Sequence, residues 1–233
     1  MRWQSEITDY GLCVFPEFAG IRVLMMPFSV QDPARTLPAY MRGYVPMVEQ
    51  MRAAGRVGTG LAYLTIDERE VPAGACHRRP GLHVDGWRDD IGMGVWGGSN
   101  WAGGVGGYGM LMAASHVGAV AWAQEFNGEP ATFGGCEGLR YQCCSENRCI
   151  LAAGRIYHCG PMTVHESIPA AADMRRQFVR LSLPSDGEWP VSCTPNPLGI
   201  MPTRTAAPRP AAFTDYAPMR NGDVFEAGYD RIV

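Results

Sequence analysis

The 233-residue sequence contains no lysine, so all 20 of its basic residues are arginine. This absence excludes a lysine Schiff base and the lysine of a phosphate-binding P-loop. The sequence also lacks the run of about 20 apolar residues that spans a bilayer. Its start, MRWQSEITDYG, lacks the charged-then-apolar pattern of a secretory signal. We therefore expect a cytoplasmic protein that is not inserted in a membrane.

Charge of either sign is scarce in this chain. Charged residues make up 18% of it and the formal net charge is -3, with no basic block to attract nucleic acid. Hydrophobic residues make up 46%, which is enough for a sizeable core. We interpret residues 1–233 as one domain, with an N-terminal strand and helical support at 1–59, the core at 60–184 and a Pro-rich extension at 185–233.

Cysteine is more abundant, with eight residues in the chain. Five of them crowd into one segment: Cys136, Cys143, Cys144, Cys149 and Cys159. No two cysteines follow the C-x-x-C spacing of common structural zinc modules. Free, partly buried thiols are the first interpretation, and a zinc site and a disulfide stay open as alternatives.

The N-terminal part predicts one strand and a short helical region. The run Ile21–Met26 predicts a buried strand that Pro27 closes. Asp32 followed by Pro33 is typical of a helix N-cap and a first helical proline. Two further prolines favour two short helices over one long helix, with Gly55 as the stop.

From residue 60 onward, Gly and Pro clusters separate short strand-like runs. The predicted strands are 61–66, 81–85, 108–113, 119–125, 155–159, 162–166 and 177–183. Many short strands without intervening helices favour a mainly β sandwich or jelly roll. Residues 86–107 differ, because they contain nine Gly and three Trp. They predict either a lid that closes over a ligand or a long surface loop with its Trp packed inward.

Histidine is scarce, with five residues, and two of these belong to a metal-binding pattern. His83 and Asp85 form an H-x-D pair, whose side chains point to one face if the segment is a strand. His165 is the third candidate ligand. Two His and one carboxylate on one face of an octahedral metal are typical of non-haem Fe(II). Of the three positions left open, a 2-oxo acid can chelate two and O2 can take the third.

Four residues near the end of the predicted core alternate onto one strand face: Arg176, Phe178, Arg180 and Ser182. Two arginines on an inner face cost free energy unless an anion meets them. The planar guanidinium suits a carboxylate. Arg175 should face the other way.

The order H-x-D…H…R resembles the double-stranded β-helix 2-oxoglutarate/Fe(II)-dependent oxygenases over roughly residues 60–184. The segment GRIYHCGPMTVHESIPAAADMRRQFVRLSLP is similar to the second half of that family, where a Gly-led strand precedes the distal His. The resemblance implies a mainly β fold, a jelly roll of the cupin-like kind. Here it would carry short N-terminal helices and a Pro-rich C-terminal tail.

The resemblance also implies roles for individual residues. It implies three catalytic iron ligands, His83, Asp85 and His165. Arg176 or Arg180 would bind the C5 carboxylate of the cosubstrate 2-oxoglutarate, and Ser182 would assist. We favour Arg180, because Ser182 accompanies it. Tyr108 is a candidate for a further contact with the cosubstrate.

Three sub-family patterns overlap in this segment. The spacing H-x10-R-x3-R resembles taurine-dioxygenase-like enzymes, the run from His165 to Ser182 is similar to TET-type nucleobase oxygenases, and His165-Glu-x-x-Pro169 resembles prolyl hydroxylases. We expect hydroxylation of a C–H bond in a small-molecule, amino-acid or peptidyl substrate, with release of succinate and CO2. Two alternatives stay open: TET-like oxidation of a modified nucleobase, which the net charge disfavours, and a cupin-like protein that binds a metal or small acid without turnover. A homo-oligomer is compatible with each.

Overall fold

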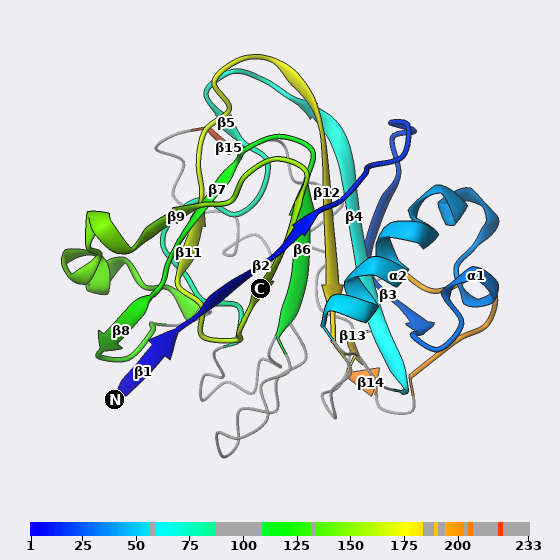
Figure 1. The fold of residues 1–233 in the computed structure, drawn as a ribbon, viewed down its shortest axis with the longest axis horizontal. Coiled ribbons are helices and arrows are strands. Elements are labelled where there is room, and N and C mark those ends of the chain that lie inside the picture. The colour runs from blue at the N-terminus through cyan, green and yellow to red at the C-terminus, as the bar shows by residue number, and fades with distance from the viewer. Residues whose placement is uncertain are drawn as a thin grey trace.

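The computed structural model describes residues 1–55, 59–86, 109–131, 134–183 and 194–202, together with short strands at 189–190, 205–206 and 219–220. Within these ranges the chain is mainly β, as predicted, and its strand pairs are antiparallel with one exception (Figure 1). None of the helices in these ranges has the length and apolar character needed to cross a membrane.

Two sheets form the body of the protein. The larger contains, in order, β2 (Ile7–Leu12), β10 (Arg155–Cys159), β6 (Met110–Ala114), β12 (Met174–Ser182), β4 (Leu61–Val71) and β3 (Arg22–Ser29). The smaller contains β11 (His165–Ser167), β7 (Ala119–Trp122) and β9 (Arg148–Ile150). The described residues also form three strand pairs: β1 (Arg2–Ser5) with β8 (Gln124–Asn127), β5 (Ala75–Cys76) with β15 (Met219–Arg220), and β13 (Trp189–Pro190) with β14 (Thr205–Ala206).

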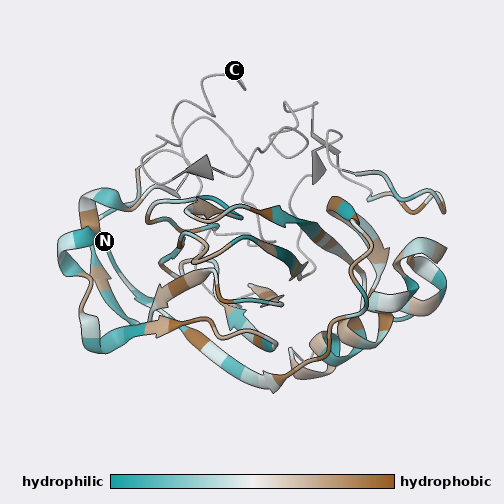
Figure 2. Ribbon diagram, turned by 90° about the horizontal axis from the view of Figure 1, so that it is seen from above, coloured by the Kyte–Doolittle hydropathy of each residue, from teal (hydrophilic) through white to brown (hydrophobic). Residues whose placement is uncertain are grey.

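Short helices cover one face of the larger sheet (Figure 2). They are α1 (Pro33–Thr36), η1 (Ala39–Tyr44) and α2 (Val45–Ala54), and the chain has further 3-10 turns at η3 (Glu137–Gln142) and η4 (Ser145–Asn147). The predicted N-cap is confirmed, because Asp32 Oδ1 accepts from the backbone N–H of Arg35 at 3.1 Å. Gly55 follows α2 as its C-cap, so the expected short helices are confirmed as well.

Strand β12 has two different faces, as its alternation predicts. Val179 and Leu181 belong to the apolar cluster beneath the helices. Phe178 points the other way and belongs to a second cluster with Met110 of β6 and Ala121 of β7. The larger and smaller sheets therefore pack against each other through the second face of β12.

Several predicted strand boundaries are wrong. The run 61–66 extends to Val71 in β4, 162–166 contains only the start of β11, and 177–183 begins at Met174 in β12. Three further differences are larger. Strand β3 does not end at Pro27 but continues to Ser29; it is an edge strand, where the missing N–H of proline is tolerated. Residues 81–85 are not a strand, and only His83 forms isolated bridges there. The run 119–125 divides into β7 and β8. In the described part of the C-terminal extension, Thr194 and Asn196 lie against β3, and Asn196 Nδ2 donates to the carbonyl of Pro27 at 2.8 Å.

One buried carboxylate joins the helices to the larger sheet. Glu68 Oε1 accepts from the Tyr44 hydroxyl and from Gln177 Nε2, and Oε2 accepts from the backbone N–H groups of Ala19 and Ile21. Burial raises the pKa of Glu68, but these hydrogen bonds outweigh it and hold the pKa below its ordinary value. The ionised carboxylate therefore stabilises the fold.

We predict that Glu68→Ala lowers the free energy of unfolding by about 3 kcal/mol, because it leaves several buried donors without an acceptor. Since the folded-state pKa is lowered, the contribution is present above the ordinary Glu pKa of about 4.3 and is lost as the pH falls. Urea unfolding at pH 7 and pH 3.5 measures both effects. The exposed Glu49→Ala is the control, and an equal loss in the two variants would contradict the role of Glu68.

Candidate metal centre

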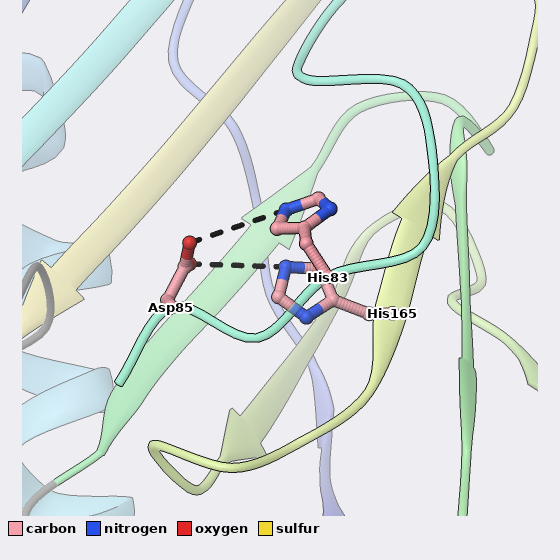
Figure 3. A group of neighbouring side chains, drawn as sticks. All are labelled: His83, Asp85 and His165. Carbon is pink, nitrogen blue, oxygen red and sulfur yellow. Dashed lines mark ion pairs between the residues drawn. The ribbon is translucent and has the colours of Figure 1, made fainter. Parts of the chain in front are cut away.

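Backbone pairing brings two distant histidines together. His83 and His165 face each other in an isolated antiparallel bridge, with N–H to carbonyl distances of 2.9 Å and 3.0 Å in the two directions. Their ring centroids lie 4.3 Å apart. Asp85 follows His83 by two residues, and its carboxylate points at both imidazoles (Figure 3).

The ring nitrogens of both histidines are set for metal binding. His83 Nδ1 lies 2.7 Å from the carbonyl of Gly81, and His165 Nδ1 lies 2.8 Å from the carbonyl of Thr163. A carbonyl only accepts, so each Nδ1 carries a proton, and in the neutral ring it is Nε2 that offers the lone pair to a metal. Both Nε2 atoms face Asp85.

The three side chains form a compact donor set. His83 Nε2 lies 4.0 Å from Asp85 Oδ1, and His165 Nε2 lies 3.7 Å from Asp85 Oδ2. Within the described residues this is the one group of three His, Cys or carboxylate side chains close enough to share a metal ion. An ion about 2 Å from each donor would draw the three slightly closer together.

The electrostatics keep His83 and Asp85 in their metal-binding protonation states. Burial lowers the pKa of His83 well below its usual value, and the nearby charge of Arg79 adds to this. Burial raises the pKa of Asp85, but His165, Arg180 and His83 outweigh it and hold the pKa far below its ordinary value. At neutral pH, His83 is therefore neutral and Asp85 is charged, as a metal site requires.

Arg180 lies beside this centre, and Ser182 follows it on the same face of β12. Arg180 Nη1 lies 3.3 Å from Asp85 Oδ2, and the guanidinium is buried. Among the described residues, the Nε–H of Arg180 finds no acceptor. The fully buried Ser182 hydroxyl and Arg180 Nη2 both face the thioether of Met25. Two strong donors thus share one weak acceptor.

Arg176, the other predicted anion ligand, is engaged elsewhere. Its Nε–H donates to the carbonyl of His116 at 3.1 Å, and Nη1 donates to His77 Nδ1 at 2.7 Å. Burial lowers the pKa of His77 to about 4, so the ring is neutral and accepts. Arg176 lies four residues from Arg180 along β12, roughly 13 Å at the usual strand rise. Arg175 faces the surface, as predicted, and there it pairs with Glu70.

Sequence reasoning missed a second charged cluster next to Arg176. The fully buried Asp67 contacts three guanidinium groups and lies 3.2 Å from His77 Nε2. The arginines are Arg22, Arg69 and Arg78. The alternation of Asp67 with Arg69 on β4 was the available signal, because i and i+2 share a face.

Two predictions have different outcomes here. Tyr108 and all but the first residue of 86–107, the predicted lid or loop, lie outside the described residues. The seven cysteines that the structure describes are free thiols, and all of them except the exposed Cys144 are buried or partly buried. Burial raises the pKa of both Cys136 and Cys159 to about 12, so neither is a thiolate at neutral pH.

We predict that His83→Ala and His165→Ala each weaken binding of Mn(II) by about 100-fold or more, since each removes one of three ligands. Isothermal titration calorimetry measures the affinity, and a metal-induced rise in unfolding temperature supports it. His116→Ala is the control, because that side chain is exposed and lies outside the group. Equal Mn(II) affinity in all three variants would exclude this centre.

The chain was compared with models of protein families, with curated proteins and with solved structures. None of the three comparisons found a match.

Proposed function

We propose that this protein is an Fe(II)/2-oxoglutarate-dependent dioxygenase with a jelly-roll core, which hydroxylates a C–H bond of a small-molecule, amino-acid or peptidyl substrate. The observation that carries the proposal is the meeting of two sets of groups. His83, Asp85 and His165 converge on one point, and the buried cation of Arg180 lies directly beside them.

The donor set favours Fe(II). Two imidazole nitrogens and one carboxylate oxygen leave positions open for other ligands, whereas structural zinc sites are closed by four protein ligands. The arginine favours an acidic cosubstrate. A protein that only held a metal ion would use the guanidinium of Arg180 to keep Asp85 ionised, but it would not need the Nε–H that finds no acceptor among the described residues.

Arg180 is the better candidate for the far carboxylate of 2-oxoglutarate. Arg176 already donates to His77 and to a backbone carbonyl, so fewer of its N–H groups are available for a ligand carboxylate. Arg180 and Ser182 present donors to the same buried thioether, and a carboxylate would accept far more strongly from both. This choice agrees with the preference drawn from the sequence.

When bound, Fe(II) and 2-oxoglutarate supply the oxidising chemistry, in which O2 converts the 2-oxo acid to succinate and CO2 and one oxygen atom enters a C–H bond of the substrate. The protein orients these partners. The carbonyls behind His83 and His165 fix each ring with Nε2 toward the metal position. Arg180 and Ser182 bind the far end of the cosubstrate, and burial of both side chains limits access of water.

We predict that Fe(II)-loaded protein titrated anaerobically with 2-oxoglutarate develops the visible charge-transfer band of the chelate. Arg180→Met should weaken 2-oxoglutarate binding by about 30-fold or more, because it removes a buried charged partner worth about 2 kcal/mol or more. Arg175→Met is the matched control, since it removes a surface arginine from the same strand. Iron binding without any band would instead support a cupin-like binding protein.

We also predict that 2-oxoglutarate and the metal strengthen each other's binding. A metal ion bound to Asp85 weakens the ion pair between Asp85 and Arg180. The buried guanidinium is then stabilised more by a second anion, such as the far carboxylate of 2-oxoglutarate. Mn(II) affinity should therefore rise several-fold when 2-oxoglutarate is present, and Arg180→Met should reduce this gain while Arg175→Met keeps it. Calorimetry of Mn(II) with and without 2-oxoglutarate checks this, and a gain that Arg180→Met leaves intact would argue against the coupling.

A further inference from the structure

Met25 has an unusual backbone for a strand residue. Its φ is 48°, and among the described residues it is the one non-glycine with a positive φ. Such a conformation is strained for a side chain with a Cβ. It occurs at a β-bulge, because the register of β3 on β4 shifts between Val23 and Met26. Leu24 and Met25 together therefore face the single residue Thr65.

The bulge is held from two sides. The backbone N–H of Met25 donates to Thr65 Oγ1 at 3.1 Å. On the other side, Leu24 exchanges two hydrogen bonds of 2.9 Å with Thr194 of the C-terminal extension. A strained residue persists only where its surroundings fix it, so the bulge is a built feature of the edge strand.

The bulge aims the Met25 side chain at the anion-binding donors. Its Sδ lies 3.6 Å from Arg180 Nη2 and 3.4 Å from Ser182 Oγ, and the residue is buried. The other terminal nitrogen of the guanidinium, Nη1, faces Asp85. The guanidinium thus lies between a metal ligand on one side and the thioether on the other.

We propose that Met25 is the end wall of the 2-oxo acid subsite and selects the length of the cosubstrate. The inference rests on the proposed function, in which the triad holds one end of the acid and Arg180 with Ser182 the other. A dicarboxylic 2-oxo acid of five carbons ends at these donors. An acid longer by one methylene would push its far carboxylate against the thioether, because buried packing does not yield to an added methylene.

Two substitutions of Met25 separate its volume from its sulfur. Met25→Gly removes the wall, and glycine adopts a positive φ without strain, so the bulge is kept. Met25→Leu keeps a similar volume and removes the sulfur. The probes are 2-oxoglutarate and 2-oxoadipate, which carry the same metal-chelating group. Binding of each is followed anaerobically through the charge-transfer band of the Fe(II)-loaded protein, so the readout does not depend on turnover.

We expect the wild type to bind 2-oxoglutarate at least about tenfold more tightly than 2-oxoadipate, as one methylene in a closed pocket is worth roughly 10–200-fold. Met25→Gly should reduce this ratio by about tenfold or more, and Met25→Leu should keep it within about threefold. If the glycine variant does not fold, as judged by thermal unfolding, Met25→Ala provides the same comparison.

The outcomes separate the two proposals. If the wild type gives a band with 2-oxoglutarate and the Met25 variants keep its selectivity, the end-wall inference is wrong and the proposed function stands. If removal of the side chain tightens both acids equally, Met25 only obstructs the subsite and does not select, which also overturns the inference. If neither acid gives a band with the iron-loaded wild type, the proposed function itself fails, and the inference fails with it.

Discussion

Strand β12 buries two arginines, Arg176 and Arg180, on the face that meets the smaller sheet. A buried guanidinium costs free energy unless acceptors surround it, and the polar groups of the interior are arranged around this requirement. Arg176 donates a hydrogen bond to a neutral His77, and His77 in turn lies beside the carboxylate of Asp67. Arg180 pairs with Asp85, and the same carboxylate also faces the imidazoles of His83 and His165.

Asp85 therefore belongs to two sites at once. One oxygen faces His83, and the other lies 3.7 Å from His165 Nε2 and 3.3 Å from Arg180 Nη1. A carboxylate divided between a cation of the protein and a metal position couples the two electrostatically, because charge taken up on one side is withdrawn from the other. Asp85 meets only one terminal nitrogen of Arg180, so the Nε–H is left without an acceptor among the described residues. This donor is why we propose an acidic ligand beside the metal rather than a metal alone.

The sequence predicted which side chains converge better than it predicted the backbone geometry that brings them together. The inward face of β12 followed from alternation, since period 2 fixes side-chain direction whatever the tertiary fold. The H-x-D pair also converges, but for another reason than the strand predicted for 81–85. His83 is placed by its bridge to His165, a pairing across 82 positions that no local pattern encodes. The bulge at Met25 was equally hidden, because methionine carries no preference for a positive φ.

The two halves of the proposed site come from different layers of the fold. His83 and His165 belong to a bridge at the start of β11, whereas Arg180 and Met25 belong to β12 and β3 of the larger sheet. Their separation is set by the packing of one sheet on the other, through a close-packed cluster that contains Phe178. A span fixed in this way suits a ligand of one length. The strained bulge places the Met25 side chain at the end of the proposed subsite that lies away from the metal position. Under this proposal, the backbone strain at Met25 is retained because it positions that side chain.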